Sequence, residues 1–295
     1  MAQSMFKGLG VAIPTPFCAD ESLDEDALAR HIDFLREASV DFIVALGTTA
    51  ENPTLTHDER QRTVDIVKSH AGNIPVVMGL GGNSTRAVVE ELKRTEFDGI
   101  SAILSVAPYY NKPSQTGLYR HFAAIAEASP VPVILYNVPS RTGVNIEAAT
   151  SLALAHDYPG KIVAVKEASG RLDQAETMVI RRDAGFAVLS GDDSLAHSMI
   201  KLGGDGVISV LGNVFPREFG TMIRASLAGD ITRASIIHQH FSALYTLLFR
   251  DGNPSGVKAA LNILHPYFGE TLRLPLTPVT ASTRQELAAN IAALQ

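Results

Sequence analysis

The stretch PVILYNVPSRTGVNIEAATSLALAHDYPGKIVAVKEAS, residues 132–169, contains the repeating unit from which the fold is predicted. It begins with the short apolar run PVILYNVP at 132–139 and ends with a second run, KIVAVKEAS, at 161–169. Both runs are rich in Val and Ile, and neither alternates polar with apolar residues as a half-exposed strand would. We therefore expect two strands of a parallel sheet, each buried on both faces.

The same kind of run recurs on either side of this stretch. Six more apolar runs lie at 9–16, 41–49, 75–81, 99–108, 186–193 and 205–213. Helical patterns separate the runs, and their expected N-caps are Asp24, Thr56 in a capping box with Glu59, and Ser84 or Asn83. Eight strand–helix units predict an α/β fold, the (β/α)8 TIM barrel, and an open doubly wound sheet is the alternative.

The pattern changes after the eighth run. Residues 214–265 contain helical stretches with no further strand between them, and a last helical pattern follows at 281–295. We therefore expect a barrel core at 1–213 and a C-terminal helical extension at 214–295, packed on the barrel.

Composition excludes several classes of protein. The chain has 295 residues, a net charge of -6 and no run of Lys and Arg, which argues against a nucleic-acid partner. Its one cysteine, Cys18, cannot form an internal disulfide. His238 and His240 would point to different faces of a helix, so no metal site is expected. With no signal peptide and no long apolar run, we expect a cytoplasmic protein without a membrane partner.

The residue that carries the most chemical information is Lys166. In a TIM barrel, active residues lie at the C-terminal ends of the strands, and Lys166 follows the apolar run Ile162–Val165. Desolvation disfavours the ammonium form of a lysine, and the neutral amine is the form that attacks a ketone to give an imine. The alternative is a lysine that extends to solvent or pairs with Glu167.

Other strand ends supply hydroxyl groups and one guanidinium. Tyr136, expected on the neighbouring strand, could transfer protons, although it could equally pack its ring. Thr48 and Thr49 could bind a carboxylate, or serve only in a turn. Arg141 could bind a second carboxylate with two hydrogen bonds, or be a solvated loop residue. The glycines at 79–82 do not have the dinucleotide-binding spacing.

Several long motifs, in one order along nearly the whole chain, resemble the 4-hydroxy-tetrahydrodipicolinate synthase family. They are GTTAE at 47–51, PYYNKPSQTGLY at 108–119, YNVPSRTG at 136–143, VKEAS at 165–169, LSGDD at 189–193, GVISV at 206–210 and LRLPLTP at 272–278.

This resemblance implies a homotetramer that condenses pyruvate with aspartate 4-semialdehyde in lysine and diaminopimelate biosynthesis. It implies no cofactor and no metal. Lys166 would form the imine, with Tyr136, Thr48 and Tyr110 as a proton relay, Tyr110 coming from a neighbouring subunit. Substrate-binding residues would be Thr49 for the pyruvate carboxylate, Arg141 for the aldehyde's carboxylate, and Gly191 and Ile208 through their backbone.

Departures from the family pattern concern regulation and loop geometry. The residues matching the family's site for inhibitory lysine are Asn52, His57, Asn83 and Tyr109. However, Ala87 replaces a glutamate and Arg60 a common histidine, so we expect weak or absent inhibition by lysine. Ala50 stands where the family usually has glycine, and would be strained if its φ were positive. NPSGVK at 253–258 replaces the frequent NPIPVK.

Two rival functions differ from the synthase in testable ways. N-acetylneuraminate lyases and 2-keto-3-deoxy-sugar aldolases would keep the lysine and the tyrosine, but Arg141 suits a carboxylated aldehyde rather than a sugar. A barrel that only binds or senses a keto acid would have no need of a proton relay.

Overall fold

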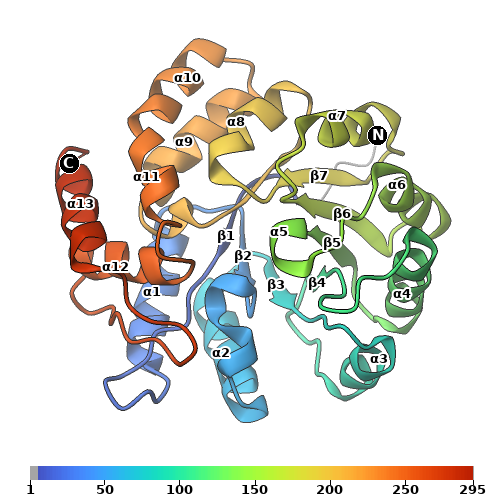
Figure 1. Cartoon of the computed structure of the whole chain (residues 1–295), viewed down its shortest axis with the longest axis horizontal. Coiled ribbons are helices and arrows are strands. Elements are labelled where there is room, and N and C mark those ends of the chain that lie inside the picture. Colours follow the sequence, from blue (N-terminus) through green and yellow to red (C-terminus); the bar gives the residue numbers. More distant parts are fainter. Residues whose placement is uncertain (1–5, 295) are drawn as a thin grey trace.

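The computed structural model describes residues 6–294, and its centre is a closed barrel of eight parallel strands in sequence order. Seven strands fall within their apolar runs and the first strand begins one residue before its run, so the predicted TIM barrel is confirmed and the open doubly wound sheet is wrong (Figure 1). The strands are β1 Gly8–Ala12, β2 Phe42–Ala45, β3 Val76–Gly79, β4 Ala102–Val106, β5 Val133–Asn137, β6 Ile162–Glu167, β7 Ala187–Ser190 and β8 Gly206–Ser209.

Helices surround the barrel and alternate with its strands. The helices of this ring are α1 Glu25–Glu37, α2 His57–Ala71, α3 Thr85–Arg94, α4 Gln115–Ala128, α6 Ala148–Asp157, α7 Leu172–Arg181, α8 Asp193–Lys201 and α9 Pro216–Leu227. The short helix α5 Pro139–Thr142 follows β5 and lies inside the ring (Figure 1). Short 3-10 helices are η1 Thr48–Ala50, η2 Asn52–Thr54 and η3 Leu211–Asn213.

The predicted N-caps are formed. The Asp24 side chain accepts from the backbone N–H of Ala27 at the start of α1, and Thr56 and Glu59 form the capping box of α2. Of the two candidates before α3, the cap is Ser84. Because these caps satisfy N–H groups that the helices leave unpaired, they fix where the barrel loops end and the helices begin.

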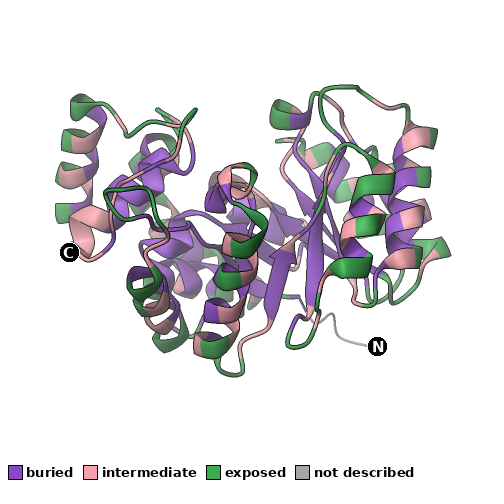
Figure 2. Cartoon of the chain, turned by 90° about the horizontal axis from the view of Figure 1, so that it is seen from below, coloured by how far each residue is buried: buried purple, intermediate pink, exposed green. Residues whose placement is uncertain are grey.

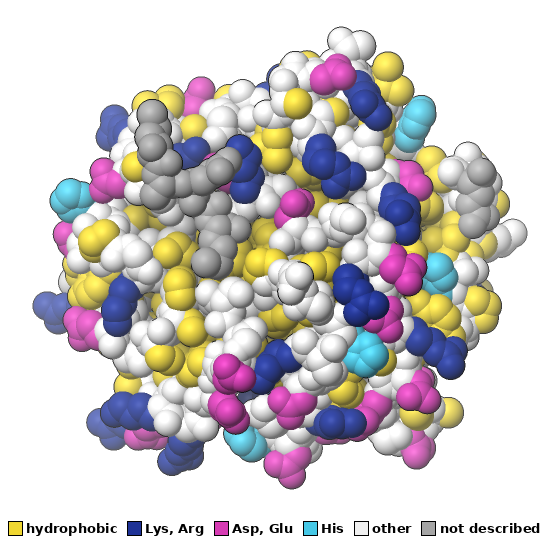
Figure 3. Space-filling model, turned by 180° about the vertical axis from the view of Figure 1, so that it is seen from behind, with side chains coloured by type: hydrophobic (Ala, Val, Ile, Leu, Met, Phe, Trp, Pro, Cys, Tyr) yellow, Lys and Arg dark blue, Asp and Glu magenta, His cyan; other side chains and the backbone are white. Residues whose placement is uncertain are grey.

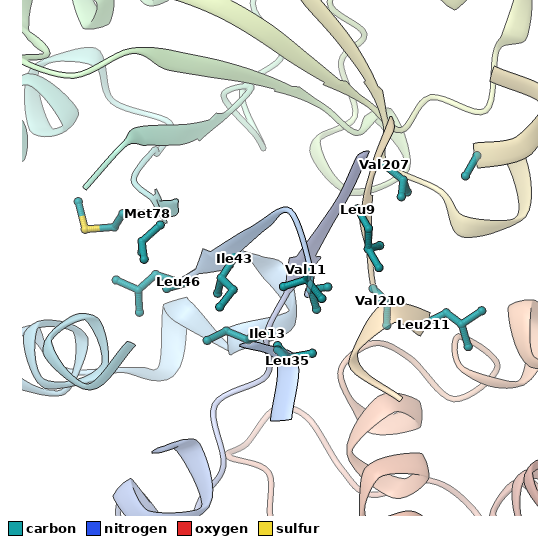
Figure 4. Packing of buried hydrophobic residues seen from close by; sticks show 14 of the residues in the cluster. Leu9, Val11, Ile13, Leu35, Ile43, Leu46, Met78, Val207, Val210 and Leu211 are labelled. Carbon is teal, nitrogen blue, oxygen red and sulfur yellow. The ribbon is translucent and has the colours of Figure 1, made fainter. Parts of the chain in front are cut away.

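The strands bury two different apolar faces, which explains their lack of polar alternation. Successive side chains of a strand point to opposite sides. On β1 and β2, Leu9, Val11 and Ile43 pack outward against the helices (Figure 4), whereas Phe42 and Val44 belong to the separate cluster inside the barrel. Strands are accordingly buried while the outer helix faces are exposed (Figure 2).

The C-terminal part consists of helices beside the barrel wall. They are α10 Ile231–His240, α11 Ser242–Leu247, α12 Ser255–Leu264 and α13 Ala281–Ala292. Helix α9 packs against α8, α10 and β1, so it joins the barrel's ring to the later helices. The division of the chain at residue 213 remains a prediction.

Surface charge is mixed. On the face seen from behind, basic and acidic side chains are interspersed (Figure 3). Within residues 6–294, no helix combines the length and the apolar character needed to cross a membrane.

Candidate active site

Lys166 and Tyr136 lie side by side at the mouth of the barrel. Tyr136 on β5 is in register with Lys166 on β6, and Ile134 and Ala164, two residues earlier on each strand, belong to the interior cluster. The same strand parity therefore turns both side chains into the barrel. Lys166 Nζ lies 4.4 Å from the centre of the Tyr136 ring, and only 5% of Lys166 and 6% of Tyr136 is exposed.

The Lys166 amine has no acidic partner. Within residues 6–294 it forms no ion pair and no hydrogen bond, and the predicted alternative of a pair with Glu167 is not observed. As the next residue on the strand, Glu167 points to the opposite side, where its carboxylate accepts from Asn137 Nδ2 at 3.0 Å, Gln174 Nε2 at 2.9 Å and the Ser169 backbone N–H at 2.7 Å. The amine is thus buried at the barrel mouth without a hydrogen-bond or ion-pair partner among residues 6–294.

The hydroxyls of Thr48 and Thr49 are supplied by η1, directly after β2. Thr49 is 2% exposed and Thr48 is half-buried. Ala50 does not have a positive φ; the left-handed residue is Glu51, with φ 55°, so the alanine carries no such strain. The Ala50 carbonyl accepts from Thr15 Oγ1 at 2.8 Å, which holds the loop onto the end of β1.

Gly191 and Ile208 complete the neighbourhood of the lysine stem. A Cβ at Gly191 would lie 2.6 Å from Ala168 Cβ and 3.2 Å from Lys166 Cε, so the absence of a side chain leaves room for the lysine. Ile208 on β8 is 1% exposed and packs in the barrel interior with Tyr136.

A cavity of about 360 Å³ opens at the same end of the barrel. We call it the active-site cavity, and among the residues that line it are Thr48, Tyr109, Tyr136, Arg141, Asn253, Pro275 and Leu276. Arg141 in α5 is exposed and makes no side-chain hydrogen bond or ion pair within residues 6–294. Its guanidinium is therefore free to bind an anion that enters the cavity.

Of the predicted catalytic and substrate-binding residues, Thr48, Tyr136 and Arg141 line the cavity, whereas Lys166, Thr49, Gly191, Ile208 and Tyr110 are not among its lining residues. Within this second group, the exposed residue is Tyr110. It is 86% exposed with a φ of 74°, and it does not line the cavity. The Tyr110 side chain is therefore open to solvent on the single chain. This placement is compatible with a role in a neighbouring subunit's site, and the role stays a prediction.

The C-terminal part contributes site residues that the sequence did not predict. Asn253 Nδ2 donates to Thr49 Oγ1 at 3.0 Å across 204 residues. Five residues later, Lys258 Nζ donates to Glu51 Oε1 at 2.5 Å, and the side chains of both are 0% exposed. Burial lowers the pKa of Lys258 to about 8, although Glu51 favours its charged form.

Arg273 extends this network to the α2 cap. Its guanidinium binds the Glu59 carboxylate, with Nη1 at 2.8 Å from Oε2, and its backbone N–H donates to Glu51 Oε2 at 3.1 Å. The hydrogen bond from Arg273, helped by those of the capping box, lowers the pKa of Glu59 to about 2. The motif LRLPLTP at 272–278 resembles that of the family, and NPSGVK at 253–258 replaces the family's frequent NPIPVK. However, no pattern in the sequence predicts that they contact GTTAE at 47–51.

A second cavity of about 270 Å³ adjoins the first. We call it the side cavity; its lining includes Asn52, His57, Arg60, Asn83, Ala87, Glu91 and Arg94. Asn52 also lines the active-site cavity, and Asn83 Nδ2 donates to the Tyr109 carbonyl at 3.4 Å. The four residues predicted for regulation therefore lie along these two adjoining cavities.

The closed barrel and the buried lysine beside a tyrosine at its mouth define a class of protein, the Schiff-base-forming (β/α)8-barrel lyases. Because the dihydrodipicolinate synthetase family model matches residues 5–294, the chain belongs to that family.

Individual members of the family are similar to this chain over nearly its full length. The chain is 49% identical to 4-hydroxy-tetrahydrodipicolinate synthase of Parabacteroides distasonis, covering 97% of this chain and 96% of that protein. It is 51% identical to the synthase of Azobacteroides pseudotrichonymphae, covering 97% of each. The solved structure of the enzyme from Cyanidioschyzon merolae with lysine bound has a TM-score of 0.94 and 39% identity, covering 99% of each chain.

Proposed function

We propose that this enzyme condenses pyruvate with aspartate 4-semialdehyde through an imine on Lys166, giving 4-hydroxy-tetrahydrodipicolinate for lysine and diaminopimelate biosynthesis. The observation that carries the proposal is the buried, unpaired Lys166 amine 4.4 Å from the Tyr136 ring at the barrel mouth. The test is turnover with the two substrates in an assay coupled to a reductase that consumes the product. Turnover of a sugar acid, with none of the semialdehyde, would favour the rival aldolases.

The residues fit the successive steps of this reaction. The Lys166 amine attacks the keto carbon of pyruvate, and loss of one water from the carbinolamine leaves the imine. Removal of a methyl proton gives an enamine, whose carbon attacks the aldehyde. The amino group of the second substrate then attacks the imine carbon, closes the ring and releases Lys166.

Protons must move at each of these steps, and hydroxyl groups are placed to move them. Tyr136 and Thr48 both line the active-site cavity, and a phenol or alcohol can donate and accept. We assign them the relay, with Tyr110 from a neighbouring subunit as its third member. Thr49 would bind the pyruvate carboxylate. The backbone groups of Gly191 and Ile208 would hold the substrate in position.

Replacement of Arg141 by alanine is expected to impair the second half of the reaction. A carboxylate bound by an arginine through two charged hydrogen bonds loses roughly ten- to a hundredfold in affinity or rate when the arginine is removed. The Michaelis constant for the semialdehyde should rise and kcat should fall. Borohydride trapping of the pyruvate imine should persist; equal loss of both steps would mean that Arg141 is structural.

Tyr110 is expected to act across a subunit interface. Inactive Tyr110→Phe and Lys166→Ala homo-oligomers, mixed after dissociation and reassembled, should regain activity, because some sites then receive both wild-type groups. Recovery is measured against the ratio of the two variants. Well-mixed hybrids that remain inactive would place the Tyr110 hydroxyl in its own subunit's site or outside catalysis.

L-Lysine is expected to inhibit weakly or not at all. The side cavity presents the guanidinium groups of Arg60 and Arg94, and its Glu91 carboxylate already faces His57 Nδ1 at 3.7 Å. Ala87 offers no carboxylate to the effector's ammonium. Half-inhibition below a millimolar concentration would contradict this expectation, whereas inhibition of Ala87→Glu but not wild type would support it.

Assembly and location complete the proposal. We infer a homotetramer in the cytoplasm, as the resemblance to the family implies. An interface with a neighbouring subunit would supply the Tyr110 that one chain does not bring to its own cavity. Sedimentation of the purified protein measures the oligomeric state.

A further inference from the structure

We propose that Asn253, in the C-terminal part of the chain, is a positioning residue that orients the Thr49 hydroxyl as a donor to the pyruvate carboxylate. This proposal rests on the role of Thr49 given above. Its basis is the hydrogen bond from Asn253 Nδ2 to Thr49 Oγ1, 3.0 Å long and buried. The exposed fractions are 7% for Asn253 and 2% for Thr49, so water cannot readily replace either partner.

A hydroxyl has one hydrogen to donate and two lone pairs that accept. Because Asn253 donates, it occupies a lone pair of Thr49 Oγ1 and leaves the hydroxyl hydrogen free. Within residues 6–294 the Thr49 side chain has no other hydrogen-bond partner. An accepted hydrogen bond also polarises the O–H group and strengthens its donation. The arrangement therefore presents a donor, rather than a lone pair, to an incoming carboxylate.

Thr49 is not itself among the residues that line the active-site cavity, but its neighbour Thr48 and its hydrogen-bond partner Asn253 are. Asn253 lines the cavity beside Thr48 and Tyr136, together with Pro275 and Leu276 from the same part of the chain. The C-terminal part thus forms one wall of the site, and its amide reaches the threonine next to Thr48.

One further contact joins α12 to the threonine loop, and two others hold α12 against the segment that follows it. Lys258 on α12 binds Glu51, two residues after Thr49, and also donates to the Thr271 carbonyl at 2.8 Å. Ser255 Oγ donates to the Thr277 carbonyl at 2.8 Å. Because α12 is tied to the loop through Lys258, the amide at 253 is held against Thr49 by more than its own hydrogen bond.

Reversing the polarity of the amide gives the sharpest test. Asn253→Asp keeps the size of the side chain but replaces the N–H donor with an acceptor. Thr49 would then donate to the new carboxylate, whose charge also repels pyruvate. We expect the Michaelis constant for pyruvate to rise roughly tenfold in Asn253→Ala and more in Asn253→Asp, as befits a hydrogen bond to a charged group. The Michaelis constant for the semialdehyde and kcat at saturating pyruvate should change much less.

A double-mutant cycle with Thr49→Val separates positioning from a general structural role. If Asn253 acts through the Thr49 hydroxyl, adding Asn253→Ala to Thr49→Val should cause little further rise in the pyruvate constant. Independent effects that multiply would overturn the proposal, as would a normal pyruvate constant in Asn253→Asp. Should Asn253→Ala fail to fold, the nearly isosteric Asn253→Asp completes the cycle.

Asn262, on the helix α12 that follows Asn253, supplies a matched control. Its amide donates to the Phe268 carbonyl at 2.9 Å and accepts from Arg284, and it does not line the active-site cavity. Asn262→Ala should lower stability without raising the pyruvate constant; a rise equal to that of Asn253→Ala would contradict positioning.

The same variants distinguish a failure of the proposed role of Thr49 from a failure of the proposed role of Asn253. If Thr49→Val alone leaves the pyruvate constant unchanged, the carboxylate-binding role of Thr49 fails, and the inference about Asn253 with it. If Thr49→Val raises the constant but neither Asn253 variant does, only the inference about Asn253 fails.

Discussion

Lys166→Ala is expected to lower kcat by on the order of a thousandfold or more, because removal of a covalent nucleophile eliminates the reaction path rather than weakening it. The wild-type amine is buried and has no partner within residues 6–294 other than the Tyr136 ring. Pyruvate with borohydride should therefore add a reduced adduct to the peptide that carries Lys166, read by mass spectrometry.

Lys161, at the opposite end of β6 from Lys166, provides the control for this prediction. Lys161 precedes β6 and its ammonium approaches the Ser129 carbonyl at 3.5 Å, far from the barrel mouth. Lys161→Ala should trap pyruvate as the wild type does. Label on another lysine, or trapping by Lys166→Ala, would refute the imine mechanism stated here.

Lys258→Ala is expected to lower the free energy of unfolding by about 3–5 kcal/mol, the usual cost of leaving a buried charge without its partner. Among the described residues 6–294, the Glu51 carboxylate would keep only the Arg273 backbone N–H as a donor, and its side chain is 0% exposed. The loss should appear as a lower denaturation midpoint in urea. The same loop carries Thr48 and Thr49, so activity should be lost at lower temperature as well.

Two comparisons make this stability prediction specific. Arg250→Ala removes an exposed ion pair with Glu286, whose side chains are 40% and 46% exposed, and should shift the midpoint much less. Glu51→Gln with Lys258→Met removes both charges and should be milder than Lys258→Ala. Equal shifts for Lys258→Ala and Arg250→Ala would show that the buried pair contributes no more to the free energy of unfolding than an exposed pair.

The place of Tyr136 and Lys166 could be predicted from the sequence, because side chains alternate between the two faces of a strand and parallel strands end at the same rim. Once 132–139 and 161–169 are parallel strands with the same burial, Tyr136 and Lys166 at their C-terminal ends must lie at one rim. The choice between Lys166 as a nucleophile and as a partner of Glu167 needed the structure, which shows Glu167 bound to Asn137 and Gln174 instead.

The sequence by itself determined the barrel, its eight strands, the helix caps and the rim that carries the chemistry. These features depend on local periodicity, on capping side chains and on the fixed direction of parallel strands, all of which act over a few tens of residues. Only the tertiary structure decided that Asn253 and Lys258 hold Thr49 and Glu51, contacts that span 204 and 207 residues. No local pattern encodes such pairs, because their partners are far apart in the sequence and are brought together by the packing of the C-terminal part beside the barrel. Tyr110 is exposed on the single chain, and its role in a neighbouring subunit's site stays a prediction.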